Sequence, residues 1–314
     1  MPRLSPINSS SLEIPQQALQ VLSYLNITNP ILLGKGGEGW IFDYHQTEVV
    51  KIYKEATQEY LEKLVSFQQQ LAQYSFSFDT PYIKQIGEVN GTFYTIEKKL
   101  SGQQLDTLIP DLNSPQRKRA YQNYYDAIKQ INSIEFAHLP FGQIIHISDS
   151  IVAPTWKEFL LLKLKQKFDR YGSRLSNQVT NYDSKVEFFR NLLSNKLQSQ
   201  YKRLVHADYY LNNVLVDNDL KISAVLDLSI HACVGDPRLD IAGVLTWNDL
   251  TPSVNPQDYE FLYEQATADY GPDVNYYVDL YRLYTAFYYS DIDNEKFSVK
   301  NLNNQEVWDR LGFN

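Results

Sequence analysis

The chain has 314 residues, of which 43% are hydrophobic and 21% charged, and this balance predicts a globular protein of one or two domains with a substantial core. Its formal net charge of −8 argues against a nucleic-acid partner and is compatible with a cationic one. Cys233 is the only cysteine, which excludes an internal disulfide and a multi-cysteine metal site. No apolar run approaches the roughly 20 residues of a membrane span, and residues 1–15 lack the pattern of a secretory signal, so we expect a cytoplasmic protein without a membrane partner.

Residues 1–100 are predicted to form a β-rich part that begins with a helix. Apolar residues at helical spacing predict this first helix over residues 11–25 and a second helix over 57–74. Asn90-Gly91, the strongest hairpin signal in the chain, separates two of the expected strands. Runs of β-branched and aromatic residues predict antiparallel strands over residues 31–33, 40–44, 49–53, 83–89 and 92–98.

Residues 101–314 are predicted to form a larger, mainly helical part. A short β-hairpin is expected within it, because the apolar runs at residues 213–216 and 222–226 flank the turn-forming segment 217–219. Helical periodicity predicts the surrounding helices over residues 117–134, 155–171, 185–204, 256–270 and 273–289. The two parts together define an α+β protein.

A glycine-rich loop, GKGGEG at residues 34–39, satisfies the pattern G-x-G-x-x-G. In a dinucleotide-binding protein a helix would begin directly after this pattern, whereas here a strand is expected. The arrangement favours a glycine hairpin folded over phosphate groups, in which Gly34, Gly36 and Gly39 let backbone amides approach the phosphates. An ordinary flexible loop would fit the same residues.

Lys51 lies within the otherwise apolar segment 49–53. An ammonium group in such a strand must be paired or carried out to solvent. A phosphate partner would explain it, and a lysine on the exposed face of a two-sided strand would fit equally well.

The segment HADYYLNNVLV at residues 206–216 places Asp208 and Asn213 five residues apart, just before the expected hairpin. Phosphoryl transfer requires a carboxylate that orients the attacking hydroxyl and accepts its proton, and a neutral oxygen ligand for the metal. Asp227 ends the return strand, where a carboxylate can hold Mg²⁺ against nucleotide phosphates. Alternatively, all three residues are turn formers, because Asp and Asn favour turns in general.

These motifs resemble the aminoglycoside phosphotransferase and choline kinase superfamily, whose catalytic loop reads H-x-D-x-x-x-x-N and whose metal-binding strand ends in Asp. The segment GDPRLDIA at residues 235–242 is similar to the family's G-D-P-x-x-D-[LI]-A. The resemblance covers residues 30–290 and implies a bilobal, protein-kinase-like fold. In that fold a small antiparallel β lobe with one helix precedes a larger helical lobe that carries the catalytic hairpin.

The resemblance also implies an activity, its cofactors and its site residues. ATP or GTP would donate a γ-phosphoryl group, with Mg²⁺, to a hydroxyl of an aminoglycoside, an amino alcohol or a sugar. The linker backbone at residues 97–100 would receive the adenine. The implied roles are catalytic base for Asp208, Mg²⁺ ligands for Asn213 and Asp227, phosphate ligand for Lys51, and nucleotide contacts for Glu97 and Lys99. His206, Asp236 and Asp240 would be structural.

Three departures from the family pattern concern the neighbours of these residues. The acidic partner of the nucleotide lysine cannot be assigned between Glu59, Glu62 and a glutamine in 68–70. Ser229 stands where many relatives carry an acid, and Ala207 replaces the commoner glycine before Asp208.

Two alternative functions remain compatible with the sequence. A protein kinase would share the glycine loop and the lysine, but Asp227-Leu228-Ser229 does not match D-F-G and no A-P-E segment follows. A nucleotide-binding regulator without turnover is the other alternative. Determinants of a cationic acceptor could come from tyrosine and tryptophan side chains or from the acids Asp249, Glu260, Glu264, Asp291 and Asp293.

Overall fold

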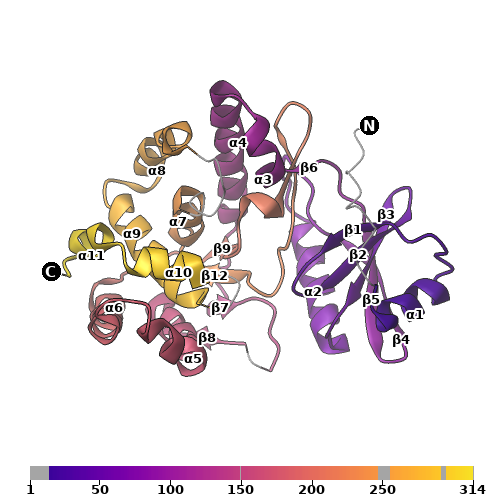
Figure 1. Cartoon of the computed structure of the whole chain (residues 1–314), viewed down its shortest axis with the longest axis horizontal. Coiled ribbons are helices and arrows are strands. Elements are labelled where there is room, and N and C mark those ends of the chain that lie inside the picture. Colours follow the sequence, from indigo (N-terminus) through magenta and orange to yellow (C-terminus); the bar gives the residue numbers. More distant parts are fainter. Residues whose placement is uncertain (1–13, 149, 247–254, 291–294, 314) are drawn as a thin grey trace. The chain divides into compact units, whose positions relative to one another are not determined.

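The computed structural model describes residues 14–148, 150–246, 255–290 and 295–313, and its contacts divide the chain into two units (Figure 1). Unit 1 comprises residues 1–104, 145–148 and 214–229, and unit 2 comprises the remainder. The sequence placed a single boundary near residue 100, whereas unit 1 also takes up the hairpin that follows Asn213. Among the described residues, none of the helices combines the length and apolar character that a membrane crossing requires.

Unit 1 is built on a five-stranded antiparallel sheet with the strand order β1-β2-β3-β5-β4. Two helices accompany it, α1 (Gln16–Tyr24) and α2 (Gln58–Leu71). A smaller sheet, ordered β11-β10-β6, completes the unit. The strands are β1 (Leu32–Lys35), β2 (Gly39–His45), β3 (Glu48–Tyr53), β4 (Ile83–Val89), β5 (Thr92–Lys98), β6 (Gln103–Gln104), β10 (Val214–Val216) and β11 (Ile222–Val225).

The two faces of the five-stranded sheet have different chemistry because strand side chains alternate. One face forms an apolar core with α1, to which β3 contributes Val50 and Ile52 and β5 contributes Tyr94 and Ile96. The intervening residues of β3 and β5 therefore point to the opposite face, which carries Lys51. The alternation of side chains along β3 thus places Lys51 on the face opposite the core.

Unit 2 consists of a four-stranded sheet with the strand order β8-β7-β12-β9 and the helices that accompany it in the chain. The strands are β7 (Phe141–Gln143), β8 (Val152–Ala153), β9 (Arg203–Val205) and β12 (Cys233–Gly235). The helices are α3 (Leu105–Leu108), α4 (Ser114–Asn132), α5 (Trp156–Ser176), α6 (Tyr182–Lys196), α7 (Arg238–Thr246), α8 (Phe261–Tyr270), α9 (Val274–Tyr288), α10 (Glu295–Leu302) and α11 (Gln305–Leu311).

The predicted helix over residues 185–204 is wrong beyond Lys196, where α6 ends. Residues 203–205 form strand β9 instead, because they pair with β12 about thirty positions later: Leu204 lies opposite Val234 and Val205 opposite Cys233. Local periodicity contains no information about such a distant partner. The predicted strands of unit 1 and the hairpin of β10 and β11 are confirmed.

Candidate active site

The loop that carries Asp208 follows β9 and is anchored by the carboxylate of Asp240, in the first turn of α7. The backbone N–H groups of His206 and Ala207 each donate to this carboxylate at 2.8 Å, and the Asn132 side chain donates at the same distance. Asp240 is buried. Burial raises the pKa of Asp240, while His206 and the three hydrogen bonds act against that shift.

A second anchor joins the same loop to α4. Tyr209 donates from its hydroxyl to the carbonyl of Tyr124 at 2.9 Å, and Tyr124 donates to the carbonyl of Tyr209 at 2.6 Å. Their rings stack with centroids 4.4 Å apart. Each residue adjoining Asp208 is therefore held by a different helix, Ala207 by α7 and Tyr209 by α4.

Ala207 has φ +61°, in the left-handed region that a side chain occupies at a cost of about 1 kcal/mol. This conformation explains why glycine is commoner at the position. The N–H bond to Asp240 and a bond from the Tyr289 hydroxyl to the Ala207 carbonyl, 2.9 Å long, hold the strained residue. The strained turn sets the direction in which the next residue, Asp208, projects.

The half-buried carboxylate of Asp208 is held by two side chains of unit 2. The Tyr289 hydroxyl lies 2.9 Å from Oδ1, and Asn213 Nδ2 lies 3.2 Å from Oδ2 and 2.8 Å from the Asp208 carbonyl. Burial, and next the charge of Asp208, hold the pKa of Tyr289 well above its usual value, so this hydroxyl keeps its proton. Asn213 turns its amide nitrogen toward Asp208 and therefore has its carbonyl oxygen to offer to a metal.

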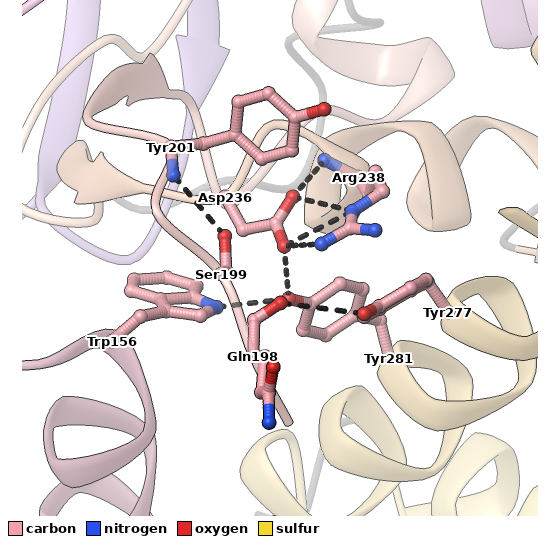
Figure 2. Close-up of polar contacts among 8 residues, drawn as sticks. All are labelled: Trp156, Gln198, Ser199, Tyr201, Asp236, Arg238, Tyr277 and Tyr281. Carbon is pink, nitrogen blue, oxygen red and sulfur yellow. Dashed lines mark hydrogen bonds and ion pairs between the residues drawn. The ribbon is translucent and has the colours of Figure 1, made fainter. Parts of the chain in front are cut away.

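The start of α7, and with it Asp240, is fixed by a buried ion pair (Figure 2). The Arg238 guanidinium binds Asp236 and lies 3.3 Å from the ring centroid of Tyr277. The Tyr281 hydroxyl donates to Asp236 at 2.8 Å and accepts from the indole N–H of Trp156 at 2.9 Å. Removing one partner from such a buried, fully bonded pair is costly, so these contacts hold α7 in place.

Gly235 completes the explanation of the GDPRLDIA segment. A Cβ at this position would lie 2.2 Å from the Trp156 ring, so the close approach of β12 to α5 requires glycine. The segment is therefore a structural motif that positions Asp240, as the sequence predicted for Asp236 and Asp240.

In unit 1, Lys51 forms its ion pair with Glu38 of the glycine loop. Glu38 also accepts a 2.7 Å hydrogen bond from the hydroxyl of Tyr60 on α2. Burial acts to lower the pKa of Lys51, but nearby Tyr53, Glu38 and Glu97 raise it above its usual value. Lys51 is therefore a firmly charged cation.

None of the candidates that the sequence offered is the partner of Lys51. Glu59 pairs with Lys63, Glu62 accepts from Gln58 at 2.7 Å, and buried Gln68 accepts from the backbone N–H of Ile83 at 2.7 Å. Sequence reasoning missed Glu38, although an acid among glycines expected to approach phosphates was a visible anomaly.

Asp227 belongs to unit 1 and lies just beyond β11. Its φ is +56°, a region that Asp tolerates better than most residues. The hydroxyl of Ser229 donates to Oδ1 at 2.6 Å, so the serine found in place of the family's acid orients this carboxylate. Asp227 also contributes, after burial, Glu38 and Tyr53, to raising the pKa of Tyr60, which places Asp227 in the electrostatic surroundings of Tyr60 and Glu38.

The other predicted nucleotide residues take different positions in unit 1. Glu97 shares the face of Lys51 and accepts a 2.5 Å bond from Thr95; burial raises its pKa, against the effect of Lys51. Lys99 instead binds Asp43 at 2.6 Å, so its side chain is engaged on β2. Among the loop glycines, Gly39 is required for steric reasons, because a Cβ at this position would lie 2.0 Å from the Ile52 carbonyl oxygen.

Among the described residues, no group of three or more His, Cys, Asp or Glu side chains could hold a metal ion. That result is consistent with the chemistry of Mg²⁺, which usually takes one or two carboxylates and completes its shell with phosphate oxygens and water. The carboxylate of Asp227 and the amide oxygen of Asn213 are hard oxygen donors of the required kind. Asp249, Asp291 and Asp293 lie outside the described residues.

Comparisons with known proteins identify the family of this chain. The model of the phosphotransferase enzyme family matches residues 36–273, and the chain therefore belongs to this family. A search of curated proteins finds no match. The family membership and the kinase-like α+β fold expected from the sequence are confirmed.

Solved structures of similar fold include a thermostable mutant of aminoglycoside phosphotransferase APH(4)-Ia, with a TM-score of 0.66 and 20% identity over 94% of this chain and 99% of that one. The streptomycin–ATP–APH(2″)-IIa ternary complex matches with a TM-score of 0.61 and 18% identity, over 95% and 97%. Macrolide 2′-phosphotransferase type I matches with a TM-score of 0.55 and 15% identity, over 94% of this chain and 98% of that one.

The substitution Asp240→Asn is expected to lower the free energy of unfolding by about 2 kcal/mol, because an amide cannot accept hydrogen bonds on both of its terminal atoms. Urea denaturation checks this value. Asp219→Asn, at an exposed turn, is the matched control and should change stability by less than about 0.5 kcal/mol. Equal stability of the two variants would refute the anchoring role.

Proposed function

We propose that this protein transfers the γ-phosphoryl group of ATP or GTP to a hydroxyl group of a small molecule, with Asp208 as the catalytic base. The observation that carries the proposal is the Asp208 carboxylate, held by Tyr289 and Asn213 on a loop that Asp240 anchors. A base contributes to catalysis only when it is within hydrogen-bonding reach of the proton it removes. The contacts of this loop hold the Asp208 carboxylate in one orientation.

In the proposed reaction, Asp208 accepts the proton of the acceptor hydroxyl as its oxygen attacks the γ-phosphorus. The bond between the γ-phosphorus and the bridging oxygen breaks, and the nucleoside diphosphate leaves with that oxygen. The Tyr289 hydroxyl, which keeps its proton, retains Asp208 in one orientation. Aligning the reactants in this way lowers the barrier through orientation.

The charged Lys51 is proposed to bind the nucleotide phosphates, together with the backbone of the loop that holds Gly34, Gly36 and Gly39. Asn213 and Asp227 would hold Mg²⁺, which when bound neutralises charge on the phosphate oxygens. The backbone around Glu97 and Lys99 is proposed to receive the base of the nucleotide. Neighbours described as complexes with ATP and with GDP support nucleotide binding and leave both donors as candidates.

Asp208→Asn is expected to reduce kcat by a factor of about 10² to 10⁴ while leaving nucleotide affinity unchanged. Release of diphosphate with a panel of aminoglycosides, amino alcohols and sugars measures the first quantity, and calorimetric titration with ATP and GTP measures the second. Asp219→Asn serves as the control. Undiminished transfer by Asp208→Asn would refute the assignment, and a wild-type protein that binds nucleotide but transfers to no acceptor would be a binding regulator.

Asp227→Asn is expected to remove the dependence of nucleotide affinity on Mg²⁺, because the amide is a weaker ligand for a hard cation than a carboxylate. The measurement compares the Kd of ATP in Mg²⁺ and in a chelator. The wild-type protein should bind more tightly in Mg²⁺, and the variant should bind equally in both. An unaltered response to Mg²⁺ would exclude Asp227 as a ligand.

Glu38→Gln is expected to tighten nucleotide binding by about three- to tenfold, because the neutral amide no longer competes with the phosphates for Lys51. The same titration measures this change. Glu55→Gln, an exposed acid close by in the chain, is the control and should have no effect. Weaker binding by Glu38→Gln would mean that Glu38 holds Lys51 in its working position instead.

A further inference from the structure

Lys54, the residue that directly follows β3, holds three successive carbonyl groups of the glycine loop. Its ammonium donates to the carbonyl oxygens of Gly36 at 2.8 Å and Gly37 at 3.1 Å. Its backbone N–H donates to the carbonyl oxygen of Glu38, again at 2.8 Å. One residue at the end of a strand therefore engages every carbonyl group from position 36 to position 38.

These contacts determine the direction of the amide groups at the loop tip, residues 36–39. Because a trans peptide group points its C=O and its N–H in opposite directions, the N–H groups of Gly37 and Glu38 point away from the Lys54 ammonium. Within the described part of the chain, the backbone hydrogen bonds do not include either of these two N–H groups, whereas the N–H of Gly36 donates to the Gly39 carbonyl oxygen at 3.0 Å. Successive backbone N–H groups of this kind can bind an anion.

The space beside the loop tip is open. A Cβ at Gly36 or Gly37 would meet no heavy atom of the described chain within 4 Å, and neither residue has a φ in the left-handed region. Neither packing nor backbone conformation therefore requires glycine at these two positions, in contrast to Gly39. A ligand that approaches the backbone closely is a reason for glycine that lies outside the chain.

The sheet supports Lys54 in this position. Strand β3 lies between β2 and β5, and the Lys54 ammonium lies 5.6 Å from the ring centroid of Trp40, which is buried on β2. Lys51, on the same strand, binds the side chain of Glu38. Strand β3 and the residue after it thus hold both the side chain and the backbone of the loop, and a nucleotide that displaces the Glu38 side chain from Lys51 leaves the contacts of Lys54 in place.

We propose that Lys54 is a positioning residue of the nucleotide site, which orients the loop tip so that the amides of Gly37 and Glu38 meet the nucleotide phosphates. This inference rests on the proposed function, because it assigns a further residue to the same site. Lys54 acts through the loop and not as a phosphate ligand, since its ammonium binds carbonyl oxygens on the side opposite those amides. Lys51 supplies charge to the phosphates, and Lys54 supplies the orientation of the loop.

The experiment measures the Kd of ATP and of GTP for the full-length protein by calorimetric titration, and hydrogen exchange of the loop amides in the nucleotide-free protein. Lys54→Met removes the ammonium, whereas Lys54→Arg keeps a charged donor, and both keep the backbone N–H bond to Glu38. Lys84→Met is the matched control, because it removes an exposed lysine of β4 that pairs with Glu48 in the same unit. Circular dichroism and the thermal midpoint show that each variant is folded.

Lys54→Met is expected to weaken nucleotide binding by about three- to tenfold, because two hydrogen bonds from a charged but solvent-exposed donor are lost. Exchange of the Gly36 amide, which is bonded across the loop tip, should become faster in the same variant. Lys54→Arg should restore both quantities toward the wild-type values, and Lys84→Met should leave both unchanged.

Unchanged nucleotide binding by Lys54→Met would overturn the inference. Weaker binding with unaltered exchange at Gly36 would overturn it as well, because Lys54 would then act as a direct phosphate ligand. Both results leave the proposed function standing. A wild-type protein that binds neither ATP nor GTP would instead refute the proposed function, and this inference with it.

Discussion

The buried carboxylate of Asp240 is the group on which the catalytic loop depends. An ionised group away from water is unfavourable unless hydrogen bonds replace its hydration, and here two successive backbone N–H groups of the loop and one side-chain amide take that place. The loop and α7 are consequently coupled, since neither can move without leaving a buried polar group unsatisfied. The ion pair of Asp236 and Arg238 extends the coupling to α9 through Tyr277 and Tyr281.

Backbone strain at two positions determines how the proposed site residues project from the chain. Ala207 and Asp227 both have positive φ values, +61° and +56°, and the first directs Asp208 while the second is itself a proposed metal ligand. Strain of this kind persists only where surrounding contacts determine the conformation. At Ala207 those contacts are Asp240 and Tyr289, and at Asp227 the neighbouring Ser229.

The sequence predicted those parts of the protein whose determinants are local. The glycine loop, the strand of Lys51, the hairpin after Asn213 and the family itself all follow from short patterns, and the strands and family are confirmed. Contacts between distant residues were beyond its reach. Glu38 was missed because the expected partner lay on a helix, and Tyr289 because nothing in the sequence joins it to Asp208, 81 positions earlier. Strand β9 was read as helix for the same reason, since its partner β12 lies far along the chain.

The net charge of the chain illustrates why a global property is a poor guide to a local site. Charges separated by more than about 8 Å are largely screened at physiological ionic strength, so the acids spread over the surface contribute little to the potential inside a pocket. The nearest charges decide that potential, and beside Tyr288 these include the ammonium groups of Lys163 and Lys167. The net charge of −8 therefore does not decide the sign of the potential around that ring.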